Sequence, residues 1–108
     1  MSVEESSVVD VIGIERDSGK VILTVSDHLD WSRQDEHEQK LQDKLNTYLR
    51  FIESGELLES YPAAKGRDPV IEVVTRVEPS PGGLQFLQRV AEIVQGAGIE
   101  FRTRVLGE

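Results

Sequence analysis

The stretch VVDVIGIERDSGKVILTVS, residues 8–26, constrains the fold more than any other part of the chain. Two runs rich in valine and isoleucine flank the tripeptide DSG, and Gly19 can supply the left-handed residue of a three-residue hairpin loop with a bulge. The pattern therefore predicts two antiparallel strands joined by a tight turn. With this loop, the expected cross-strand pairs are Arg16 with Lys20, Ile14 with Ile22, and Ile12 with Thr24. The more apolar face, which we assign to the core, then carries Val11, Val21, Leu23 and Val25.

A helical period replaces the strand pattern from residue 33 to residue 53, where apolar residues recur every three or four positions. Ser32 is the expected N-cap of this amphipathic helix, with Asp35 three residues further on. Gly55 is placed to end the helix in the left-handed conformation. The residues expected to face the core are Leu41, Leu45, Tyr48, Leu49 and Ile52.

Residues 56–69 form the predicted connection after this helix. They lack a regular hydrophobic period and contain two prolines and Gly66, so we expect a long connection with room for one short helical turn. The next segment, VIEVVTRV at residues 70–77, is rich in β-branched residues and predicts a strand.

PSPGG, residues 79–83, is typical of a helix start, with Ser80 as the cap and Pro81 at the first helical position. This second helix should end at the glycines of GAG, residues 96–98, before the alternating strand IEFRTRV, residues 99–105. The order ββαβαβ predicts an α+β protein, a two-layer sandwich in which two helices cover one face of a four-stranded sheet. We expect residues 1–8 to be a flexible N-terminus and residues 9–106 to be a single α+β domain.

Composition excludes several classes of function. The chain has 20 Asp and Glu residues against 12 Lys and Arg residues, and a net charge of -8 argues against general nucleic-acid binding. It has no cysteine, which excludes a disulfide framework and a thiol nucleophile. No signal peptide is recognisable, and no apolar run approaches the roughly 20 residues that span a bilayer. We therefore expect a cytoplasmic protein that does not associate with membranes.

Three phrases of the sequence resemble a known family when taken together. They are SDHLDW at residues 26–31, EH at residues 36–37, and LQDKLNTYLRFIESGELLESYP at residues 41–62. The chain is similar, over nearly its whole length, to a family of small bacterial proteins classified as a domain of unknown function. The resemblance implies a compact α+β domain, and it supplies no catalytic or binding residues to carry over.

The two histidines lie among carboxylates and raise the question of a metal site. Imidazole and carboxylate groups suit zinc, manganese or iron, so Asp27, His28, Asp30 and His37 are candidate ligands of a metal-binding protein or metal-dependent hydrolase. The alternative is structural: the aspartates form a turn, and the acidic residues near the helix start complement its dipole. We favour the structural interpretation, because the spacing matches no established helical metal motif. No cofactor is expected.

The predicted strand registers place a mixed set of side chains on the sheet face away from the helices. Apolar residues bordered by charge suggest an interaction surface, although the arginines can instead pair with Glu72 and Glu100 across the strands. We therefore expect a small non-enzymatic interaction protein that forms a homodimer or binds an unidentified protein partner. The predicted surface comprises Ile12, Ile14, Ile22, Val74, Arg76, Arg102 and Arg104.

The connection at residues 56–69 carries a second candidate site. Tyr61, Lys65 and Arg67 are an aromatic and basic cluster outside the regular elements, and they suggest a small-anion pocket between this connection and the start of the first helix. Alternatively, Tyr61 anchors the connection on the core while both cations stay in water.

Overall fold

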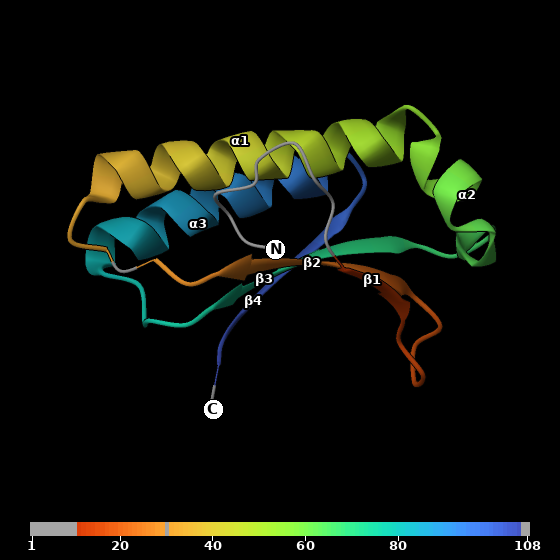
Figure 1. The fold of residues 1–108 in the computed structure, drawn as a ribbon, viewed down its shortest axis with the longest axis horizontal. Helices are drawn as coiled ribbons and strands as arrows, with labels where there is room; N and C mark the ends of the chain where they lie inside the picture. The colour runs from red at the N-terminus through yellow and green to blue at the C-terminus, as the bar shows by residue number, and fades with distance from the viewer. Residues whose placement is uncertain (1–10, 30, 107–108) are drawn as a thin grey trace.

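Four strands form one mixed sheet in the computed structural model, which describes residues 11–29 and 31–106 (Figure 1). β1 (Val11–Ile14) pairs antiparallel with β2 (Val21–Asp27). β3 (Pro69–Thr75) lies parallel to β2, and β4 (Glu100–Val105) lies parallel to β3. The strands therefore follow their chain order across the sheet. The expected flexible N-terminus lies outside the described residues.

Helices α1 (Gln34–Glu53) and α3 (Pro81–Gly96) lie on the same side of this sheet (Figure 1). The connection after α1 contains a short helix, α2 (Glu56–Ser60), and a 3-10 turn, η1 (Pro62–Ala64). The predicted α+β class with a four-stranded sheet is confirmed, and the connection is more ordered than predicted. None of these helices is long and apolar enough to cross a membrane.

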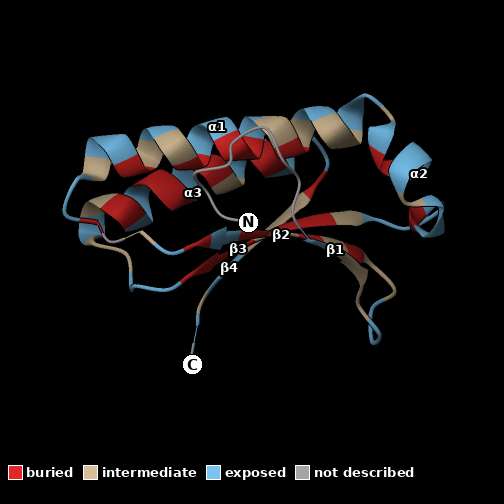
Figure 2. Ribbon diagram, viewed as in Figure 1, coloured by how far each residue is buried: buried red, intermediate tan, exposed pale blue. Residues whose placement is uncertain are grey.

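The core lies between the sheet and the two long helices, where Figure 2 shows the buried parts of α1 and α3 directed toward the strands. β2 alternates between buried and more exposed residues, as a strand with one covered face requires, whereas the central strand β3 buries residues on both of its faces. The main contributors to the core are Val21, Leu23, Val25, Ile71 and Val73 from the sheet, Leu41, Leu45 and Tyr48 from α1, and Phe86, Leu87, Val90 and Val94 from α3.

Three of the four predicted helix ends are confirmed, and one of them is the end of α3 at Gly96, the first glycine of GAG. Ser80 caps α3 by accepting a hydrogen bond from the Gly83 N–H at 3.1 Å, and Gly55 follows α1 with a φ of 89°. The prediction of Ser32 as the cap of α1 was wrong, because the helix begins at Gln34 with Arg33 at the N-cap and no side-chain cap. The chain enters α1 where the burial of Trp31, just before this turn, places it. This position depends on packing and cannot be read from local capping chemistry alone.

The predicted hairpin register was wrong by one residue. Ile14 lies opposite Val21 and Ile12 opposite Leu23, so both isoleucines face the helices and pack against the core. The loop is longer than predicted, because Glu15 N–H donates to the Lys20 carbonyl at 2.8 Å and four residues lie between them. A shift of one residue moves every β1 side chain to the opposite face. Ile12 and Ile14 therefore leave the predicted interaction surface, and Val11 lies outside the core at 42% exposure.

Candidate functional site

A buried acid–histidine pair joins the end of β2 to the beginning of α1. Asp27 Oδ2 lies 2.5 Å from His37 Nε2, and the two side chains are 0% and 2% exposed. The other oxygen of the carboxylate accepts a hydrogen bond from the Leu29 N–H at 3.2 Å. Trp31 stacks on the imidazole, with ring centroids 3.7 Å apart and planes inclined by 27°. This arrangement satisfies both oxygens of a buried carboxylate and fastens a strand to a helix.

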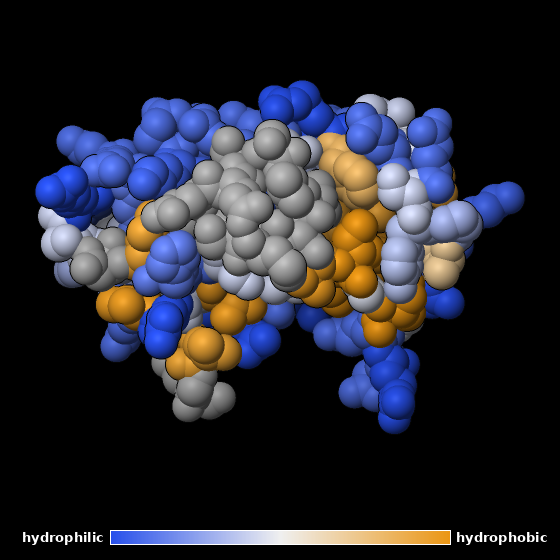
Figure 3. Space-filling view, in the orientation of Figure 1, coloured by the Kyte–Doolittle hydropathy of each residue, from blue (hydrophilic) through white to orange (hydrophobic). Residues whose placement is uncertain are grey.

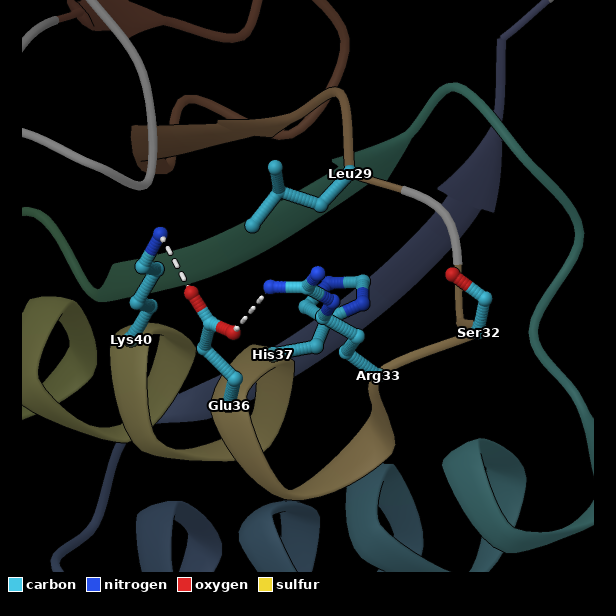
Figure 4. A pocket seen from close by; sticks show the side chains of 6 residues that line it. All are labelled: Leu29, Ser32, Arg33, Glu36, His37 and Lys40. Carbon is cyan, nitrogen blue, oxygen red and sulfur yellow. Dashed lines mark ion pairs between the residues drawn. The ribbon is translucent and has the colours of Figure 1, made fainter.

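A pocket of about 240 Å³ lies beside His37 and opens between the strand end and α1 (Figure 4). Its rim carries Glu36 between two cations, with Lys40 Nζ at 3.4 Å and an Arg33 nitrogen at 3.5 Å. The hydrogen bond from Lys40 is the main cause of the lowered pKa of Glu36, and Arg33 adds to it. Both cations of this rim are therefore held by a carboxylate of the same helix.

The three predicted metal ligands that the structure describes, Asp27, His28 and His37, do not converge. Asp27 and His37 form the buried pair, whereas His28 lines a different pocket together with Arg76 and Arg104. Asp30 lies outside the described residues. Within residues 11–29 and 31–106, no group of three or more histidine and acidic side chains is placed to hold a metal ion. Successive side chains at the end of a strand point to opposite faces, which separates His28 from its neighbour Asp27.

The face of the sheet opposite α1 and α3, called the open face below, carries a chain of ion pairs. The Arg102 guanidinium contacts the Glu15 carboxylate at 2.8 Å and also binds Glu100, whose carboxylate lies 2.5 Å from Lys20 Nζ. Arg102 is the main cause of the lowered pKa of Glu15, and Lys20 followed by Arg102 lowers the pKa of Glu100. Of the two glutamates considered in the sequence analysis, Glu100 thus pairs with Arg102 of its own strand, β4.

The end of the open face differs, because its cations are less engaged. Arg104 Nε is 3.4 Å from a Glu72 oxygen, and its side chain remains 56% exposed. Arg76 has no ion pair or side-chain hydrogen bond with any residue that the structure describes. Both arginines border a pocket of about 400 Å³, which we call the strand-end pocket. Its lining residues are Thr24, Ser26, Asp27, His28, Val74, Arg76, Arg104 and Leu106.

Register explains why these side chains meet. Ser26, Val74 and Arg104 are neighbours across β2, β3 and β4. Two backbone hydrogen bonds of 2.8 Å, from the Arg76 N–H to the Asp27 carbonyl and from the Leu106 N–H to the Thr75 carbonyl, continue the ladder beyond the strand ends. Ser26, Val74 and Arg104 thus form one row across the open face, and a second row on the same face follows it, made of His28, Arg76 and Leu106.

The predicted anion pocket at the connection was wrong in its geometry. α2 and η1 lie at the opposite end of α1 from its first turn, so no pocket can join the two (Figure 1). Arg67 instead donates to the Gly19 carbonyl at 2.8 Å and to the Ala63 carbonyl at 3.0 Å, which ties the connection to the hairpin loop. Tyr61 is half-buried against the core and Lys65 is exposed.

A buried lysine escaped the sequence analysis. Lys44 is fully buried on α1, and its Nζ lies 5.8 Å from the centroid of the Tyr48 ring, within range of a cation–π contact. The Tyr48 hydroxyl donates to the Thr24 carbonyl at 2.7 Å, which fastens α1 to β2. The signal was present in the spacing, because Lys44 falls three residues after Leu41 and four before Tyr48 on the buried stripe.

Comparison with known proteins adds one finding. Residues 1–107 match the model of a family described as a family of unknown function (DUF6572), which agrees with the resemblance seen in the sequence. No curated protein and no solved structure matches the chain.

Proposed function

The chain belongs to a family of unknown function (DUF6572), and we propose that it is a small non-enzymatic interaction protein that binds a protein partner through the open face of its sheet. In this proposal the fold works as a two-layer sandwich, with helices over one face and a partner over part of the other. The observation that carries the proposal is the pairing of an unengaged cation, Arg76, with an exposed apolar side chain, Leu106, in one pocket.

The distribution of polarity supports a binding role for the sheet side. In the view of Figure 3, hydrophilic residues dominate over α1, while apolar residues gather lower down along the sheet. Leu106 is 58% exposed beside the arginines of the strand-end pocket. Arginine next to apolar surface is a frequent combination at the energetic centres of protein interfaces. Away from this pocket, Arg102 is held by two carboxylates, so binding is expected at the strand ends of the open face.

Burial argues for a structural rather than a catalytic role of the acid–histidine pair. The imidazole of His37 is 2% exposed and stacks on Trp31, and its Nε2 contacts Asp27. A general base must reach the proton that it abstracts, directly or through one water. The buried pair is better suited to holding β2 and α1 together.

Self-association is the simplest form of this function, and it is directly measurable. Light scattering across a micromolar concentration series should show a dimer for the natural chain and a monomer for Leu106→Glu, which places a negative charge at the strand-end pocket of the open face. Leu58→Glu is the matched control, because Leu58 is 50% exposed on α2, away from the strand ends.

A strict monomer whose state none of these variants changes would remove the homodimer. Affinity capture with the natural chain and with Leu106→Glu as bait then tests a foreign partner. A protein that the natural chain captures and Leu106→Glu does not capture supports binding through the open face. Equal capture by both baits places the binding surface elsewhere.

A further inference from the structure

We propose that the strand-end pocket recognises a carboxylate next to an apolar side chain, as presented by the C-terminal residue of a partner chain. This inference rests on the proposed function and assigns the chemistry of its ligand. It follows from the two rows of side chains that the parallel strands bring together at their carboxyl ends, Ser26–Val74–Arg104 and His28–Arg76–Leu106.

Charge makes the pocket selective for an anion. Arg76 stands in the middle of the second row without a carboxylate partner among the described residues, and Arg104 stands beside it with one 3.4 Å contact to Glu72. A guanidinium offers a fork of N–H donors that matches the two oxygens of a carboxylate. The net charge of -8 repels anions at long range, but screening limits this effect to about 8 Å at physiological ionic strength. The attraction of the arginines is therefore local to the pocket.

Apolar surface distinguishes a peptide carboxylate from a simple anion. Val74 forms a nearly buried floor at 9% exposure, and Leu106 stands 58% exposed at the end of the second row. An inorganic anion would engage the arginines and leave Leu106 in water. A terminal residue with an aliphatic side chain would bind the arginines through its carboxylate and also cover Leu106. The hollow of about 400 Å³ is within the usual range of about 300–1,000 Å³ for small-ligand sites.

A hydroxyl group and an imidazole group complete the lining. Ser26 is exposed in the first row, and His28 is exposed in the second, next to Arg76. A hydroxyl or an imidazole N–H can donate a hydrogen bond to a carboxylate, and neither group adds negative charge. The buried carboxylate of Asp27, which also borders the pocket, already holds His37 and the Leu29 N–H and is turned away from the ligand position.

Titration of the ¹⁵N-labelled chain with N-acetyl-leucine, followed by NMR, tests the inference. The amides of residues 26, 28, 74, 76, 104 and 106 should shift with the free acid. N-acetyl-leucinamide, which lacks the carboxylate, and inorganic phosphate, which lacks the apolar group, should each bind at least about tenfold more weakly at equal ionic strength. Arg76→Gln should weaken the acid by about tenfold. Arg16→Gln is the matched control, since Arg16 is an exposed arginine of the hairpin loop at the other end of β2.

Each contrary result overturns a defined part of the argument. Equal binding of acid and amide removes the role of the carboxylate, and equal binding of phosphate removes the role of the apolar surface. Unchanged binding by Arg76→Gln, or equal loss in Arg16→Gln, places the site elsewhere. If N-acetyl-leucine does not bind while association remains sensitive to Leu106→Glu, this inference fails and the proposed function stands. If neither is observed, both fail.

Discussion

Replacing Gly83 by alanine tests the packing that holds Trp31 against the first turn of α3. A Cβ at this position would lie 2.8, 2.9 and 3.0 Å from Cε3, Cδ2 and Cζ3 of the Trp31 ring. Carbon atoms in favourable contact are about 3.5–4.0 Å apart, so the overlap involves three atoms of one rigid group. The ring has little freedom to retreat, because it is buried and stacks on His37.

Gly82 provides a matched comparison one residue earlier in the same turn. The three atoms nearest to a Cβ there all belong to the amide end of the Gln34 side chain, which can rotate away. Alanine should gain about 1 kcal/mol over glycine in a helix, and overpacking of a rigid core group costs about 1–3 kcal/mol. We therefore expect Gly82→Ala to be neutral or slightly stabilising and Gly83→Ala to be less stable than Gly82→Ala by about 1–3 kcal/mol.

Urea unfolding monitored by circular dichroism and by tryptophan fluorescence measures this difference, and Trp31 is the only tryptophan of the chain. Gly83→Ala should also change the emission of Trp31 in the folded state, whereas Gly82→Ala should leave it as it is. Equal stability of the two variants, or a more stable Gly83→Ala, would refute the argument that Trp31 requires a glycine beneath it.

Two further predictions concern charged groups. Asp27→Ala and His37→Ala should each lower the free energy of unfolding by about 3–5 kcal/mol, because each leaves a buried polar group without its partner. The double variant should lose less than the sum of the two single losses. Additive losses in urea unfolding would contradict the pairing. Glu15 and Glu100 have pKa values below their ordinary 4.5 in the folded protein, so the unfolded chain binds more protons as the pH falls. Their contribution to the free energy of unfolding is present above about pH 4.5 and is lost as the pH falls through the pKa values of the folded state. Arg102→Met should flatten this acid dependence of stability, and an unchanged slope between pH 3 and pH 6 would contradict the role of the ion pairs.

The elements whose ends depend on local chemistry were predictable from sequence. Ser80 and Pro81 start α3 as predicted, and Gly55 adopts the left-handed conformation that its place after α1 requires. The hairpin register was not predictable in the same way. It depends on one additional loop residue, and the loop is closed by hydrogen bonds from Ser18 to Glu15 and from the Lys20 N–H to Ser18. Several loop lengths satisfy the same DSG pattern, and only the closed loop distinguishes them.

The candidate sites were less predictable, because they depend on which face each side chain occupies. Asp27 and His37 are ten residues apart, and they meet because α1 returns along β2. His28 follows Asp27 directly, yet it joins Arg76 on the other face. The basic character of the open face was visible in the sequence, but the division between engaged Arg102 and unengaged Arg76 requires the register of β3 and β4.

The chain order of the strands has a consequence for how the protein reaches this structure. Each strand of the sheet pairs only with strands that precede or follow it immediately in the sequence. Pairing between successive strands closes smaller loops than pairing between more distant strands would, which favours faster folding because less chain entropy is lost before each contact forms. No strand must be inserted between two others that are already paired. During synthesis, β1, β2, α1 and β3 can therefore assemble from the N-terminal side, and α3 with β4 can complete the sheet last by addition to its free edge.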